Sequence, residues 1–129
     1  MAPHRTPHKG QKVAFPQRGE IYLVSFDPTV GAEIQKTRPA LVIQNDIGNQ
    51  YSPITIVAAI SSKFDLPPYP TEVVIAPKDS GLSQISAVVL NQIRSVDCQR
   101  LIKRIGKASP EIMERVDRAL QISLGLVNI

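Results

Sequence analysis

The sequence predicts a mainly β protein: an antiparallel barrel or half-open barrel with one C-terminal α-helix packed on it. Two observations carry this prediction. Between residues 19 and 105, six or seven short segments rich in β-branched residues alternate with turn residues. After Ser109, the spacing of apolar residues changes to three and four, which is typical of a helix. The length of 129 residues suits one domain.

The composition of residues 1–17 predicts a disordered basic tail. A single domain is expected over residues 18–129. The tail has prolines at three positions and neither helical nor strand periodicity. His4 and His8 would share one face of a helix and could bind a metal, but Pro3 and Pro7 disfavour that helix. We therefore favour a tail without a metal site.

The net charge of +4 comes from the start of the chain. Residues 1–18 contain four of the 15 basic residues and no acid, which leaves eleven basic against 11 acidic residues in the rest. The chain also contains neither a secretory signal nor the ~20 apolar residues of a membrane span. These observations predict a cytoplasmic protein that does not enter a membrane.

The first predicted elements are three strands and a turn. Residues 20–26 form a strand rich in β-formers. Residues 40–43 are apolar throughout, which predicts a central strand with Pro39 at its start. Residues 44–49 have turn chemistry with room for one helical turn, and residues 55–60 form the next strand.

The second half of the predicted sheet contains four shorter segments. A proline-rich loop over residues 62–70 leads to a strand at 71–75, and residues 79–81 form a turn. Residues 87–90 and 93–96 read as two separate strands, followed by a last strand at 101–105.

The C-terminal helix has a strong start signal. Ser109 is the expected N-cap, Pro110 takes the first helical position and Glu111 lies in the first turn. The apolar residues behind them recur on one face. That face consists of Ile112, Met113, Val116, Ala119, Leu120 and Leu124.

The residue inventory excludes most enzyme classes. Both histidines lie in the tail, so the domain cannot build a Ser-His-Asp triad. There is no Gly-rich phosphate loop, and the single Cys98 forms neither a disulfide within the chain nor a cysteine-based metal site. The carboxylates show no liganding spacing, so we expect no metal and no cofactor. An enzyme built on this chain would work with Arg, Ser, Thr, Glu or Gln.

The connection over residues 27–39 is unusually long and ends in Arg38. Arg38 stands where the chain enters an apolar strand. It is either a rim residue paired with Glu33 or a guanidinium fork presented to a phosphate by the stiff backbone at Pro39. The residues alone leave both interpretations open.

Six segments, in order along the chain, carry a resemblance to a known family. They are RGEIYL at 18–23, DPTVGAE at 27–33, RPALVIQND at 38–46, IVAAIS at 56–61, VLNQIRSVD at 89–97 and VDRALQISL at 116–124. Together they resemble the MazF/PemK family of toxin endoribonucleases over everything except the tail.

The resemblance implies an SH3-like barrel of the MazF/CcdB type, assembled as a homodimer. It also implies the toxin of a type II toxin–antitoxin system: a sequence-specific, metal-independent endoribonuclease that cleaves single-stranded mRNA. The 2′-hydroxyl would attack phosphorus and leave a 2′,3′-cyclic phosphate and a 5′-hydroxyl. The implied partner is a MazE-type antitoxin whose acidic disordered tail folds across the RNA groove.

The resemblance also implies the catalytic residues. Arg38 matches the family's catalytic arginine, whose fork can hold the charge that develops on phosphorus. Ser61 occupies the position of the catalytic threonine and keeps its hydroxyl without the methyl group. Glu33 matches an acid proposed as general base in some members. Ala32 stands where many members carry serine.

Three further residues are candidates for RNA contact. Gln92 matches a position that contacts RNA in relatives, and Asn45 lies in a matching turn; both can read base edges or satisfy backbone groups. Tyr69 or Phe64, in the loop over residues 62–70, can stack on a base or pack against the domain. This loop and residues 29–37 would flank the groove.

Two alternatives belong to other functional classes. A non-catalytic toxin of the gyrase-poisoning type shares this fold, but those relatives rely on a C-terminal tryptophan and this chain has no Trp. A degenerate nuclease that binds RNA or its partner without cutting is motivated by Ser61 and Ala32.

Overall fold

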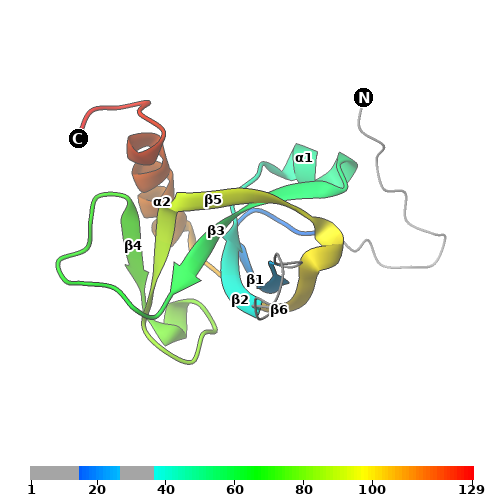
Figure 1. Ribbon diagram of the computed structural model, residues 1–129, viewed down its shortest axis with the longest axis horizontal. Coiled ribbons are helices and arrows are strands. Elements are labelled where there is room, and N and C mark those ends of the chain that lie inside the picture. The colour runs from blue at the N-terminus through cyan, green and yellow to red at the C-terminus, as the bar shows by residue number, and fades with distance from the viewer. Residues whose placement is uncertain (1–14, 27–36) are drawn as a thin grey trace, which may run out of the picture.

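The computed structural model describes residues 15–26 and 37–129, which form a six-stranded antiparallel sheet and a C-terminal helix. The strand order is β4-β5-β3-β2-β1-β6 (Figure 1). The strands are β1 (Glu20–Ser25), β2 (Thr37–Val42), β3 (Ile54–Ser61), β4 (Glu72–Ile75), β5 (Ser86–Asp97) and β6 (Leu101–Lys107). The helices are α1 (Asp46–Tyr51), the 3-10 turns η1 (Pro77–Asp79) and η2 (Cys98–Arg100), and α2 (Pro110–Ser123). The expected mainly β fold with a C-terminal helix is confirmed.

Each face of the sheet has its own apolar core. Leu41 of β2 and Ala58 of β3 belong to the larger core, which includes Ile112 and Val116 of α2. The neighbouring residues of β2 point the other way, because side chains alternate along a strand. Ala40 and Val42 of β2 therefore belong to a smaller core on the opposite face of the sheet. This core consists of Val24, Ala40, Val42, Val57 and Val96. One face is therefore closed by α2, and the other is left for a site.

The sheet curls without closing into a barrel. Within the described residues β4 and β6 are its two edges, and no hydrogen-bonded pairing joins them. Backbone packing closes part of the gap: a Cβ on Gly106 of β6 would lie 2.1 Å from the Ser80 carbonyl oxygen. Gly81, with φ +79°, packs the same turn against Ile105. Only glycine permits this approach, so two backbone surfaces without side chains pack directly on each other and close part of the half-open barrel.

The two strands predicted at 87–90 and 93–96 are one strand, so that prediction was wrong. β5 pairs with β3 throughout, but the register jumps between Ala58↔Ile93 and Ala59↔Val89. Three residues, 90–92, are therefore bulged out of the ladder. The Leu90 carbonyl in this bulge accepts a hydrogen bond of 2.8 Å from Ser123 Oγ at the end of α2. The helix thus supplies a partner for a group in the bulge.

Pro39 and Leu124 also differ from their predicted places. β2 begins at Thr37, and Pro39 lies inside it, opposite Leu23 of β1. The pairing with β3 starts only at Ala40, so the missing N–H of Pro39 interrupts no ladder on that side. Leu124 is the C-cap of α2 and is 52% exposed rather than docked.

The start of the domain is held by Arg18. Its backbone N–H donates to Asp46 Oδ1 at 2.7 Å, and its guanidinium contacts the Ile43 carbonyl at 2.9 Å and Asp117 at 2.5 Å. Pro16, in the predicted tail, is buried, and Gln17 N–H donates to Glu20 at 2.6 Å. The rest of that tail, 1–14, lies outside the described residues, as do residues 27–36. In the described part, no helix is long and apolar enough to cross a bilayer.

Candidate active site

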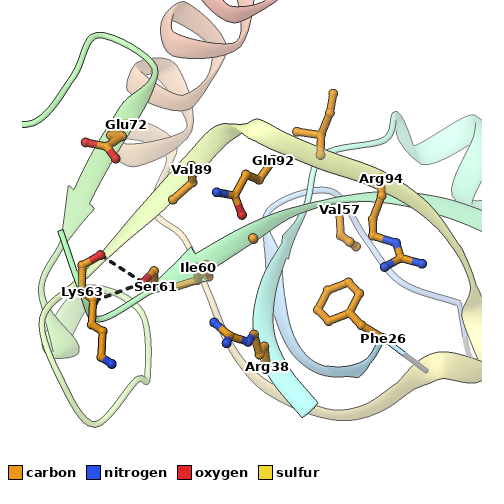
Figure 2. A pocket seen from close by; sticks show the side chains of 12 residues that line it. Phe26, Arg38, Val57, Ile60, Ser61, Lys63, Glu72, Val89, Gln92 and Arg94 are labelled. Atoms are coloured by element: carbon orange, nitrogen blue, oxygen red, sulfur yellow. Dashed lines mark hydrogen bonds between the residues drawn. The ribbon is translucent and has the colours of Figure 1, made fainter. Parts of the chain in front are cut away.

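A groove of about 590 Å³ lies on the sheet face opposite α2. It crosses β2, β3, β5 and β4, and its floor is largely apolar (Figure 2). Its lining residues are Phe26, Arg38, Val57, Ala59, Ile60, Ser61, Lys63, Glu72, Val89, Gln92, Ile93 and Arg94. A rigid sheet with polar side chains around an apolar floor can hold the bases and the backbone of a nucleotide chain.

Strand register brings Arg38 and Ser61 to one place. The β2–β3 ladder pairs Val42 with Val57 and Ala40 with Ala59. Continued by two residues, the same register sets Arg38 opposite Ser61, and both line the groove. Two side chains that are far apart in sequence thus lie on neighbouring strand ends, as the prediction of a shared site requires.

Ser61 is held by the backbone of Lys63. Its Oγ accepts a hydrogen bond from Lys63 N–H at 3.1 Å and donates one to the Lys63 carbonyl at 3.1 Å. The accepting contact fixes the oxygen at the end of β3. Because the donated bond is long, the hydroxyl proton can rotate toward a ligand while the oxygen stays in place.

The groove carries positive charge. Arg38, Lys63 and Arg94 line it, against a single lining carboxylate, Glu72. Within residues 15–26 and 37–129, none of the three cationic groups makes a side-chain hydrogen bond or ion pair. Glu72 Oε1 accepts a hydrogen bond from Tyr69 N–H at 3.0 Å and so anchors the preceding loop. Unneutralised cations around an apolar floor favour an anionic ligand.

A second pocket of about 270 Å³ adjoins the groove and shares Arg38, Ile60, Ser61 and Lys63 with it. Its other walls are more polar, because Ser62, Ser83, Gln84 and Ser86 contribute to them together with Pro39 and Leu82. The four shared residues therefore lie at the junction of the two pockets.

A buried ionisable cluster supports β1. Glu20 is 8% exposed, and its carboxylate accepts hydrogen bonds from Arg104 Nε at 2.6 Å and Tyr22 OH at 3.2 Å. Burial, together with the negative charge of Glu20, raises the pKa of Tyr22 to about 12. Neither pocket is lined by these residues, so the cluster stabilises the strand without serving the site.

The structure separates the predicted site residues. Arg38, Ser61 and Gln92 line the groove together. Asn45 does not: it is the N-cap of α1, with its Oδ1 accepting from Gly48 N–H at 2.7 Å. Tyr69 is 67% exposed and lines neither pocket. Glu33 lies outside the described residues.

Sequence reasoning missed three groove residues: Phe26, Lys63 and Arg94. The Arg94 guanidinium carbon lies 5.1 Å from the centroid of the Phe26 ring, which is a cation–π contact. Only the strand pairing reveals this neighbourhood, because Phe26 follows β1 and Arg94 belongs to β5. Lys63 follows Ser61 by two residues, and this proximity in sequence was the one available signal.

Comparisons with known proteins agree with this architecture. A family model described as a PemK-like, MazF-like toxin of type II toxin–antitoxin systems matches residues 17–124. The curated protein Endoribonuclease EndoA of Bacillus subtilis (strain 168) is 46% identical over 112 residues, covering 87% of this chain and 97% of that protein.

Solved structures share the fold. A crystal structure of MazE–MazF (Form-II) from Deinococcus radiodurans matches with a TM-score of 0.73 and 26% identity, covering 87% of this chain and 97% of the other. An endoribonuclease in complex with its cognate antitoxin, from a mycobacterial species, matches with a TM-score of 0.70 and 23% identity, covering 88% and 99%. Because the family model spans most of the described domain and a relative is 46% identical along nearly its whole length, this chain belongs to the PemK-like, MazF-like toxins of type II toxin–antitoxin systems.

Proposed function

We propose that this toxin is a metal-independent endoribonuclease that cuts single-stranded mRNA at a short sequence motif. The observation that carries the proposal is that Arg38 and Ser61 line the same cationic groove, with the Arg38 guanidinium unengaged by the described residues. The 46% identity to an endoribonuclease supports the same activity.

The proposed reaction uses the RNA's own nucleophile. The 2′-oxygen loses its proton and forms a bond to phosphorus, the P–O5′ bond breaks, and the 5′-oxygen takes up a proton. The products are a 2′,3′-cyclic phosphate and a 5′-hydroxyl. Negative charge accumulates on the non-bridging oxygens in between, so the protein must supply positive charge and hydrogen-bond donors there.

Arg38 and Ser61 fit these needs. Arg38 offers two parallel N–H donors to two phosphoryl oxygens, and its charge is permanent because its pKa lies above ~12. The same high pKa makes it a poor free-standing base, so we assign it to charge stabilisation. Ser61 would turn its hydroxyl from the Lys63 carbonyl to a phosphoryl oxygen. Glu33 remains the proposed base.

The groove also suggests how the RNA lies. With the scissile phosphate at Arg38 and Ser61, one neighbouring nucleotide would occupy the larger groove and the other the polar pocket. Gln92 would read a base edge in the larger groove. Asn45 and Tyr69 are less well placed for RNA contact, since neither lines a pocket.

We further propose the setting of the activity. The toxin would act in the cytoplasm as a homodimer, and a MazE-type antitoxin would neutralise it by laying an acidic segment across the cationic groove. Two of the structural relatives are described as complexes of toxin with antitoxin, which supports this partner class.

The experiment is cleavage of a long, mixed-sequence RNA by the purified protein in EDTA, with the 5′ ends of the fragments mapped. We expect discrete cuts at one motif that disappear in Arg38→Ala, while thermal unfolding of the variant matches wild type. Arg115→Ala, an exposed position on α2 that lines neither pocket, is the control for lost charge and should still cut. Near-normal cleavage by a folded Arg38→Ala protein would overturn the assignment. RNA binding without cleavage by wild type would leave the degenerate-nuclease alternative.

A further inference from the structure

Phe26 and Arg94 form a stacked pair whose role the cleavage chemistry does not explain. Figure 2 shows the pair at one end of the groove, with Ser61 and Lys63 at the other. Phe26 packs on the smaller core beside Val57. The Arg94 guanidinium carbon lies over the ring, 5.1 Å from its centroid. The core therefore supports the ring, and the ring supports the guanidinium.

Structural roles do not account for Arg94. Within residues 15–26 and 37–129, its guanidinium forms no ion pair and no hydrogen bond, and the residue is exposed. A long side chain with several torsions would normally sample many rotamers at such a position. The contact with Phe26 restricts that freedom and orders a planar cation in the groove wall.

We propose that Phe26 and Arg94 form a base-stacking subsite, in which a nucleobase of the bound RNA stacks on the guanidinium that Phe26 supports. This inference rests on the proposed endoribonuclease function and adds a subsite for a base away from the cut. Guanidinium planes and aromatic rings are the surfaces on which single-stranded bases stack. Gln92, two residues before Arg94 on β5, lines the same groove and is placed for the edge of that base.

A stacking role differs from a phosphate contact in what it needs. A contact with one phosphate can be made by a point charge, so a Lys ammonium at position 94 would retain part of it. A stack needs the planar guanidinium, its support by the Phe26 ring, and a base at one position of the RNA. A stacking subsite therefore predicts that removing one RNA base and replacing either side chain have non-additive effects on the binding affinity.

The test uses oligonucleotides that span the mapped cut, carry 2′-deoxyribose at the cut to prevent cleavage, and have one abasic sugar at each position in turn. Binding is measured by fluorescence anisotropy. For wild type we expect one abasic position to weaken binding roughly tenfold through lost stacking. For Phe26→Leu and Arg94→Lys, the intact oligonucleotide should bind roughly tenfold more weakly, and the abasic penalty at that position should vanish.

Two controls separate stacking from other effects. Phe26→Leu keeps an apolar side chain on the smaller core, so it should fold, as thermal unfolding will show. Phe64→Leu removes an aromatic residue that lines neither pocket and should retain the full abasic penalty.

The outcomes are distinct. An unchanged abasic profile in both variants, or normal binding by Arg94→Lys, overturns the subsite. A phosphate contact would instead appear as a fall of about 0.7 in the salt slope for Arg94→Gln without coupling to any base. If wild type cuts no RNA, the proposed function fails, while the same titrations with single-stranded homopolymers and their abasic versions still test the stack.

Discussion

Replacing Gly106 with alanine should destabilise the half-open barrel strongly. The new Cβ would lie 2.1 Å from the Ser80 carbonyl oxygen, whereas real Cβ contacts essentially never fall under 3.0 Å. About 0.9 Å must therefore be recovered by moving backbone, since the obstacle is a carbonyl rather than a flexible side chain. Overpacking of this kind costs typically 1–3 kcal/mol, and rigid backbone on both sides places this case at about 3 kcal/mol.

The measurement is thermal unfolding at fixed protein concentration. With an unfolding entropy of about 2.1 cal/mol/K per residue, 1 kcal/mol corresponds to roughly 4 °C for a domain of this size, so Tm should fall by about 12 °C. Activity should fall as well, because the Ser80–Gly81 turn leads directly into the wall of the polar pocket at Leu82.

Gly125→Ala is the matched control. Gly125 has φ +72°, but a Cβ added there would meet no atom within 4 Å, so only backbone strain of about 1 kcal/mol is expected. A Gly106→Ala protein that melts within about 4 °C of wild type, or no lower than Gly125→Ala, would refute the proposed backbone contact.

Three further predictions follow from the described contacts. Asn49→Ala should cost about 2–4 kcal/mol in urea unfolding, because the fully buried amide accepts from Thr55 Oγ1 at 2.7 Å and donates to the Gln44 carbonyl at 3.0 Å. Stability should fall as pH rises from about 10 toward 12, because the pKa of Tyr22 is raised from 10.0 to about 12 and the fold therefore favours the protonated phenol. Tyr22→Phe should flatten that pH dependence in urea midpoints. Ser61→Ala should lower kcat for RNA cleavage by roughly 10- to 100-fold, and Ser61→Thr should restore it, since the hydroxyl is the group that donates.

Each of these has a clear contrary result. If the urea midpoint of Asn49→Ala equalled that of wild type, the hydrogen bonds of the Asn49 amide would not stabilise the fold. An identical alkaline profile for Tyr22→Phe would place the titration elsewhere. Full activity of Ser61→Ala would remove the hydroxyl from the mechanism.

The sequence predicted the parts of the fold that local chemistry determines. The Ser109 cap, Pro110 and the apolar face located α2, and Ser109 Oγ does accept from Ile112 N–H at 3.2 Å. Turn residues located most strand ends within one or two positions. Residues 46–51 form a longer helix than the single turn expected, because the buried Asn49 adds tertiary hydrogen bonds that no local pattern shows.

The candidate site was predictable only where a motif carried it. Arg38 and Ser61 came from the resemblance, and the register then gave a physical reason for their proximity. The Phe26–Arg94 contact depends on which strands pair, which spacing along the chain does not reveal. An asparagine such as Asn45 can read a base edge, but here its Oδ1 accepts the hydrogen bond from Gly48 N–H that caps α1.

The bulge in β5 makes this strand intolerant of a change in length. Before the bulge, the even-numbered Val88 belongs to the larger core with α2; after it, the even-numbered Arg94 and Val96 face the groove side, so the odd shift of three residues reverses the alternation. Deleting one residue there would turn Ser95 and Asp97 toward the smaller core and remove Arg94 from the groove. Single-residue deletions should therefore inactivate the toxin far more often in residues 90–92 than in the exposed loop over residues 65–70. In a deletion scan, cells that express an inactive toxin survive. Surviving clones should therefore carry deletions at residues 90–92 and rarely at residues 65–70.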